Sequence, residues 1–177
     1  MNRPALIASL LILAAGVAAP ASAHITLAEP SALSGASYTA SFRVSHGCDG
    51  SPTVALRVEI PEEVTSAKPE AKAGWSVRVE TAPLAKPARP GGDAAARVIA
   101  VAWRGRLDAH QADRFDVSVK LPARSGLLYF PTVQTCESGE NRWTQIPAPG
   151  AAWTSVPRPA PVLHLSSDGA GAEAKPR

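Results

Sequence analysis

The sequence predicts an all-β fold, an antiparallel sandwich or barrel of short strands. Apolar side chains recur at every second residue in several segments, which is the period of a strand with one buried face. Turn-forming Gly, Pro, Asp and Ser residues separate these segments, and no segment combines a sustained helical period with caps at both ends. Many short strands punctuated in this way are typical of sandwiches and barrels.

The expected strands follow one another along the chain from residue 24. Residue 24 is expected to be the first residue of the mature chain, so we expect the strand that starts there to lie at an edge of the fold. Four segments alternate clearly, two are continuous apolar runs typical of buried strands, and two are short closing strands. In that order they are 37–45, 53–60, 75–79 and 115–121; 97–103 and 127–135; and 142–146 and 162–165.

Two stretches between these strands lack a strand pattern. Residues 61–68 hold at most a turn or two of helix. Residues 81–96 are dense in Pro, Ala and Gly, which indicates a long surface loop connecting two strands.

Residues 1–23 have the three parts of a secretory signal peptide. Arg3 gives a positive start, residues 6–19 an apolar run, and residues 21–23 an A-x-A cleavage site. The run is too short and too Ala-rich to be a membrane span. Cleavage would leave one domain at 24–165 and a small, polar, disordered tail at 166–177. We therefore expect a periplasmic or secreted protein without a membrane anchor.

The charge and motif content argue against several function classes. The formal net charge is +3, and Lys and Arg are spread among acidic residues instead of being clustered, so no nucleic-acid partner is expected. No nucleophile–base–orienter set for acyl transfer and no catalytic carboxylate pair is recognisable. The sequence therefore favours a binding protein over an enzyme.

His24 is the residue that indicates a metal. Cleavage after Ala23 would make it the mature N-terminus, where the α-amine and the imidazole Nδ1 can close a six-membered chelate ring on one ion. A mixed-nitrogen, tetragonal site of this kind suits Cu(II). A free α-amine has a reference pKa near 7.7–8.0 and must lose its proton to bind metal, so copper affinity is expected to fall as the pH drops.

Cys48 and Cys136 are the two cysteines of the chain. An even count in an exported protein favours a disulfide between them, and closing a loop of about 88 residues would contribute roughly 4–5 kcal/mol in the chain-entropy model. The alternative is that the two thiolates bind Cu(I).

Several short motifs occur along the mature sequence in a recognisable order. They are His24-Ile25-Thr26-Leu27, residues 46–51 (HGCDGS), 60–64 (IPEEV), 72–75 (KAGW), 129–136 (YFPTVQTC) and 143–147 (WTQIP). As an ordered set they resemble the YcnI family of exported bacterial proteins, over about residues 24–165. The resemblance implies an immunoglobulin-like or fibronectin-like β-sandwich that binds Cu(II).

The resemblance also implies site residues. The N-terminal metal ligand of the family corresponds to His24, and a tryptophan near the metal corresponds to Trp143. The position of the family's carboxylate ligand holds Arg57, with Glu59 one strand repeat further on and facing the same side. In a Cys-containing branch such as this one, His46 is the other candidate to complete the site.

The function implied is that of an exported Cu(II) carrier, chaperone or copper-homeostasis accessory. Its expected partners are the copper ion and another periplasmic copper carrier or a membrane copper importer. One alternative is a copper oxidoreductase of the lytic polysaccharide monooxygenase type, with His24 and His46 as a two-histidine brace. Another is a metal-free interaction module.

Overall fold

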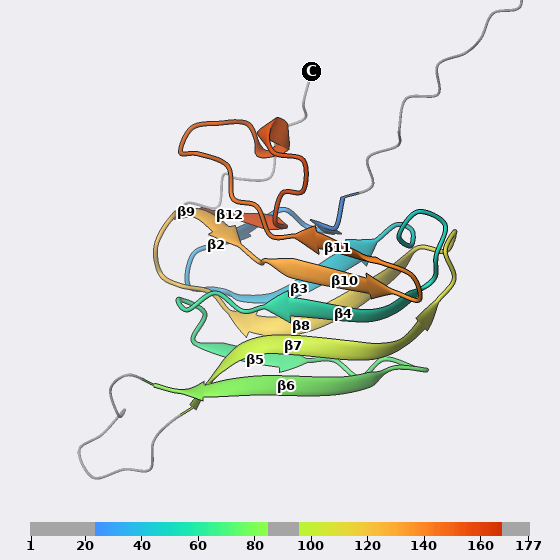
Figure 1. Cartoon of the computed structure of the whole chain (residues 1–177). Helices are drawn as coiled ribbons and strands as arrows, with labels where there is room; N and C mark the ends of the chain where they lie inside the picture. Colours follow the sequence, from blue (N-terminus) through green and yellow to red (C-terminus); the bar gives the residue numbers. More distant parts are fainter. Residues whose placement is uncertain (1–23, 85–95, 168–177) are drawn as a thin grey trace, which may run out of the picture.

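The strands form two facing antiparallel sheets, with a smaller third sheet beside them (Figure 1), which confirms the predicted all-β sandwich. The computed structural model describes residues 24–84 and 96–167. The predicted signal peptide, most of the predicted tail and residues 85–95 of the predicted loop lie outside this part. No helix among the described residues has the length and apolar character that a membrane crossing needs.

The sheets are assembled from strands that are distant in the sequence. Among the strands of the described residues, only β12 and β2 pair in parallel, and the other strand pairs are antiparallel. The four-stranded sheet has the order β1 (Thr26–Leu27), β3 (Ser37–Val44), β8 (Asp113–Lys120) and β5 (Ser66–Pro69). The five-stranded sheet has the order β11 (Glu140–Trp143), β10 (Thr132–Cys136), β4 (Thr53–Glu59), β7 (Ala96–Leu107) and β6 (Ser76–Pro83). The third has β2 (Ser31–Leu33), β12 (Val162–Ser166) and β9 (Gly126–Tyr129).

The structure differs from the predicted elements in several places. β2 was not predicted, and β6 and β7 extend into the two ends of the predicted loop at 81–96. Two further differences have a clear physical reason. The apolar run at 127–135 is two strands in different sheets, β9 and β10, because Pro131 between them has no N–H to donate to a ladder. The expected helical turn at 61–68 is wrong toward its end, where β5 pairs with β8 at a sheet edge. An edge strand tolerates Pro69 and needs little alternation, which explains why the pattern hid it.

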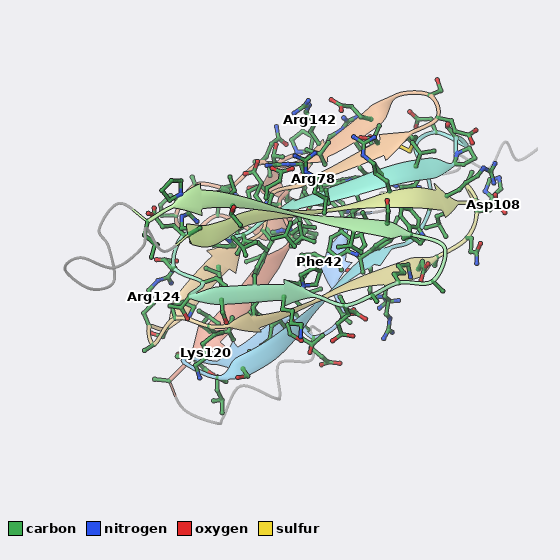
Figure 2. The ribbon with its side chains drawn as sticks, turned by 90° about the horizontal axis from the view of Figure 1, so that it is seen from below. Phe42, Arg78, Asp108, Lys120, Arg124 and Arg142 are labelled. Carbon is green, nitrogen blue, oxygen red and sulfur yellow. A yellow bond between two sulfur atoms is a disulfide. The ribbon has the colours of Figure 1, made fainter. Side chains whose placement is uncertain are left out.

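Large aromatic side chains fill the space between the two main sheets. Phe42, Trp103, Phe115 and Phe130 are fully buried, and their rings meet edge to face, with centroids 5.5 Å apart for Trp103–Phe115 and for Phe42–Phe130. Figure 2 shows Phe42 between the layers. Burying one such ring stabilises the fold by about 2–3 kcal/mol, so the core holds both sheets without help from a metal.

The edges of the two main sheets decide where His24 lies. β1 is one of the two edge strands of the four-stranded sheet, as expected, and β11 is one of the two edge strands of the five-stranded sheet. Both edges lie on the same side of the sandwich, where the β11–β12 connection with its short 3-10 turn Trp153–Ser155 also passes (Figure 1). Three segments that are distant in sequence therefore meet at the predicted start of the mature chain.

Tyr38 ties the segment after β1 to β3, and it predicts a pH dependence. Its hydroxyl donates to the Glu29 carbonyl, and burial, aided by the Glu29 charge, raises the Tyr38 pKa to about 12. The Tyr38 phenol therefore ionises at a lower pH in the unfolded chain than in the folded protein. Its contribution to the free energy of unfolding is complete below pH 10 and is lost as the pH rises toward 12. We expect about 1–2 kcal/mol to be lost over this window after solvent screening.

The measurement is the free energy of urea unfolding between pH 9 and 12 for the wild type and Tyr38→Phe. The variant should lose less stability over this window, because it has no phenol to ionise at this position. Parallel curves for the two proteins would contradict the assignment.

Candidate metal centre

His24 is the first described residue and lies two positions before the edge strand β1, which begins at Thr26. Alternation along the strand buries Ile25 and Leu27 in the core, whereas His24 and Thr26 are half-buried. The strand is held to β3 by the Leu27–Phe42 register and by the Ala28 N–H, which donates to the Ser41 carbonyl. The backbone that carries His24 is therefore set by the core, while its side chain stays at the rim.

Two tryptophans lie against the His24 imidazole. The Trp143 ring centroid lies 5.4 Å from that of His24, with an angle of 54° between the ring planes. The Trp153 ring centroid lies 5.0 Å from that of His24, with an angle of 53°. Trp143, the tryptophan that the family resemblance implies near the metal, comes from β11, and Trp153 comes from the 3-10 turn. A cation bound at His24 would therefore lie beside two indoles, the aromatic groups that attract cations best.

Both indole N–H groups are bonded away from His24. Trp143 Nε1 donates to Gln134 Oε1 at 3.3 Å, and Trp153 Nε1 donates to the Ala160 carbonyl at 2.7 Å. Since a tryptophan has no other polar atom in its side chain, each offers His24 only aromatic carbon surface. These bonds also hold the two rings in orientation.

The segment that carries Trp153 is closed at its base by Gln145. The Gln145 N–H donates to the Arg158 carbonyl, the Gln145 carbonyl accepts from Ala160, and Gln145 Oε1 accepts from the Arg158 N–H at 2.7 Å. A loop whose ends are bonded together is a compact Ω-like loop. Sequence analysis missed Trp153, because its irregular, Pro-rich surroundings carry no strand or helix period.

A surface cavity of about 230 Å³ adjoins this site. Trp153 forms one wall, and the exposed His164 of β12, which sequence analysis did not select as a site residue, forms part of another. The full lining is Thr26, Leu27, Pro30, Trp153, Val162 and His164. The rim around His24 therefore has both an aromatic cover and an open flank.

Glu59 lies elsewhere on the molecule. Trp143 and Val58 are both buried and are register partners of Thr132, so Glu59, next to Val58, faces the opposite, outer side of the sheet. There it pairs with Arg57 at 2.9 Å. The structure does not bring Glu59 to the indoles around His24.

Arg57 also forms an ion pair with Glu80 on this outer face, at 2.8 Å. The hydrogen bonds between the two side chains raise the pKa of Arg57 and lower that of Glu80. On the same side of the sheet, Figure 2 shows Arg78 and Arg142. The outer face is therefore a row of charged residues in which Glu59 already has a partner.

His46 follows β3 and is half-buried. Its Nδ1 lies 2.6 Å from the Gly47 carbonyl, and its own carbonyl accepts from Gln134 Nε2 at 2.8 Å. Within residues 24–84 and 96–167, no three His, Cys, Asp or Glu side chains gather closely enough to hold a metal ion. His24, His46 and Glu59 thus do not meet as one cluster in the described part.

Cys48 and Cys136 form a disulfide, as expected, and both are buried. The bond joins the turn after β3 to the end of β10 and commits both sulfurs, so neither is a thiolate available to Cu(I). The Cys48 N–H also donates to Cys136 Sγ at 3.0 Å. The bridge is structural in this form of the protein.

Gly47 in the turn next to this disulfide has no room for a side chain. A Cβ there would lie 1.9 Å from the Ser51 carbonyl oxygen. We expect Gly47→Ala to lower the free energy of unfolding by at least about 3 kcal/mol, because backbone atoms must move to relieve the collision. Gly139→Ala is the control: it meets open space at φ +80° and should cost about 1 kcal/mol. Equal losses in urea unfolding would contradict this prediction.

The fold and the rim together define an immunoglobulin-like β-sandwich that presents a histidine, flanked by two indoles, two residues before an edge strand. The chain belongs to the family described as "Domain of unknown function (DUF1775)", whose model matches residues 24–165.

One solved structure extends this comparison. It is an uncharacterised protein from Nocardia farcinica with an immunoglobulin-like fold, 29% identical in sequence, with a TM-score of 0.63 over 81% of this chain and 98% of that one. No curated protein matches the chain.

Proposed function

We propose that this protein is an exported Cu(II)-binding protein of the YcnI type, in its Cys-containing branch, that carries copper on its mature N-terminal histidine. The observation that carries the proposal is the placement of His24, two residues before an edge strand, with its imidazole against Trp143 and Trp153. After cleavage at Ala23, the α-amine and Nδ1 of His24 would supply two nitrogen donors, which fit Cu(II).

The surroundings of His24 support a carrier. The buried core fixes the strand that follows His24, and the two indoles beside its imidazole would add cation–π attraction to a cation held there. His46 and Glu59 enter the proposal only as secondary ligand candidates, since Glu59 faces the outer side of the sheet and pairs with Arg57 there. The disulfide is compatible with an oxidising, extracytoplasmic compartment.

Copper would be the cargo of this protein, and no catalytic step is proposed. The natural partners are a second periplasmic copper carrier or a membrane copper importer. The cavity beside Trp153 leaves this side of the site open, which supports exchange of the ion with such a partner.

The proposal is tested by copper titration of the protein produced with His24 as its first residue. One equivalent of Cu(II) should bind, with an electron paramagnetic resonance spectrum that reports at least two nitrogen donors. It should also quench the emission of Trp143 and Trp153, so a Trp143→Phe/Trp153→Phe variant, which retains Trp75 and Trp103, should show little quenching. Absence of stoichiometric binding would refute the proposal.

A further inference from the structure

The inner face of β10 is polar where a sandwich core is ordinarily apolar. Thr132, Gln134 and Cys136 share this face, because they are two residues apart in a strand. Gln134 is only 2% exposed, and burying an amide is unfavourable unless its polar atoms find partners. A residue with this cost needs a structural or functional explanation.

The Gln134 amide has a partner on each side. Nε2 donates to the His46 carbonyl and to Thr53 Oγ1, both at 2.8 Å, while Oε1 accepts from Trp143 Nε1 at 3.3 Å. The orientation of the amide is unambiguous, because a carbonyl only accepts and an indole N–H only donates. Both N–H groups and the oxygen are used, so the side chain is locked.

The network connects the disulfide region to the rim at His24. His46 precedes the turn that holds Cys48, and Thr53 Oγ1 lies 3.8 Å from Cys136 Sγ. At the other end, Trp143 contacts the His24 imidazole. The amide of Gln134 is therefore the link between a cross-linked part of the core and the indole that lies against the proposed ligand.

We infer that Gln134 is a positioning residue for the His24 site, which sets the Trp143 indole against the His24 imidazole. This rests on the proposed function for its consequence in copper binding, but its structural consequence exists without metal. The β10–β11 ladder places the Trp143 backbone opposite Thr132, and the bond to Gln134 then sets the rotation of the ring. Without it, the donor would be buried and unpaired, and the ring would turn to find another acceptor.

The first experiment uses Gln134→Met, which keeps a long, unbranched side chain but removes all three hydrogen bonds. In the copper-free mature protein, the nuclear magnetic resonance shifts of the His24 ring protons, which the Trp143 ring current perturbs, should move toward the values of an isolated histidine. With copper, affinity should fall about 10-fold or more, as is typical when an outer partner of a metal ligand is lost. The electron paramagnetic resonance parameters should change at unaltered stoichiometry.

A double-mutant cycle separates positioning from general damage. Trp143→Phe keeps a ring near His24 but has no N–H for Gln134, and it remains testable if Gln134→Met folds poorly. In the Trp143→Phe background, Gln134→Met should alter copper affinity less than about 2-fold, because the link is already broken. Thr53→Val is the matched control: it removes another partner of Gln134, does not touch Trp143, and should leave the His24 shifts close to those of the wild type.

The outcomes are distinguishable from those of the proposed function. Native His24 shifts and native affinity in Gln134→Met would overturn the inference, as would an equal loss in both backgrounds of the cycle. If the wild type binds no copper, the proposed function fails, and the metal-free shifts alone decide the role of Gln134.

Discussion

Adding one alanine before His24 of the mature protein should lower its affinity for Cu(II) by at least about 100-fold. The extension converts the α-amine into an amide nitrogen, which no longer binds as a simple amine donor, while the imidazole, both indoles and the fold remain. Loss of an outer partner of a ligand typically costs 10–100-fold, so loss of a direct donor should exceed it. Isothermal titration against a competing chelator measures the change.

His24→Gln should be at least as severe as the extension, because it removes the imidazole and leaves the amine. The matched control is His110→Gln, which alters an exposed histidine in the turn at 108–111 and should leave copper binding unchanged. If the extended protein binds Cu(II) as tightly as the mature form, the amine is not a ligand and the chelate must be abandoned.

Removing the disulfide should have the largest effect on stability. We expect Cys48→Ala/Cys136→Ala to lower the free energy of unfolding by about 4–5 kcal/mol, because the bridge closes a loop across a sequence separation of 88 residues in the unfolded chain. Domains of this size are stable by only about 5–15 kcal/mol in total, so the variant would be marginal at 37 °C. Urea unfolding followed by tryptophan emission measures the loss.

Reduction offers an internal control for this prediction. A reducing agent should bring the wild type close to the double variant while leaving the variant itself unaffected. A loss smaller than about 1 kcal/mol in both cases would show that the unfolded chain gains little freedom when the bridge opens.

Most strands were predictable because the alternation of apolar and polar residues is visible within the strand's own sequence. The alternation at 37–45 and 115–121 depends only on which neighbours face the core, and β3 and β8 lie there. Sheet membership is not local. The run at 127–135 looks like one strand in the sequence, but it is divided at Pro131 because β9 pairs with β12 and β10 pairs with β4. β5 escaped detection for the related reason that an edge strand needs few apolar residues.

Two residues of the candidate site could be predicted, one from its position in the chain and one from the family motifs. His24 follows from the predicted cleavage site and Trp143 from the ordered motifs, whereas Glu59 was selected from the family's carboxylate position, one strand repeat away. The structure places Glu59 on the outer face with Arg57, because alternate residues of β4 face opposite sides. Trp153 and Gln134 had no local signature, since their roles lie in contacts with residues far away in sequence.

The sequence by itself determined that the chain is a β-sandwich, that Cys48 and Cys136 are suited to pairing, and that a histidine stands at the beginning of the family domain. Tertiary structure alone decided what surrounds that histidine. The edges of two sheets and the loop at 146–158 meet at one rim, and this meeting depends on how the sheets pack. The period of apolar residues indicates which side chains face the core, but it does not indicate which distant strand or loop will lie beside them in the fold.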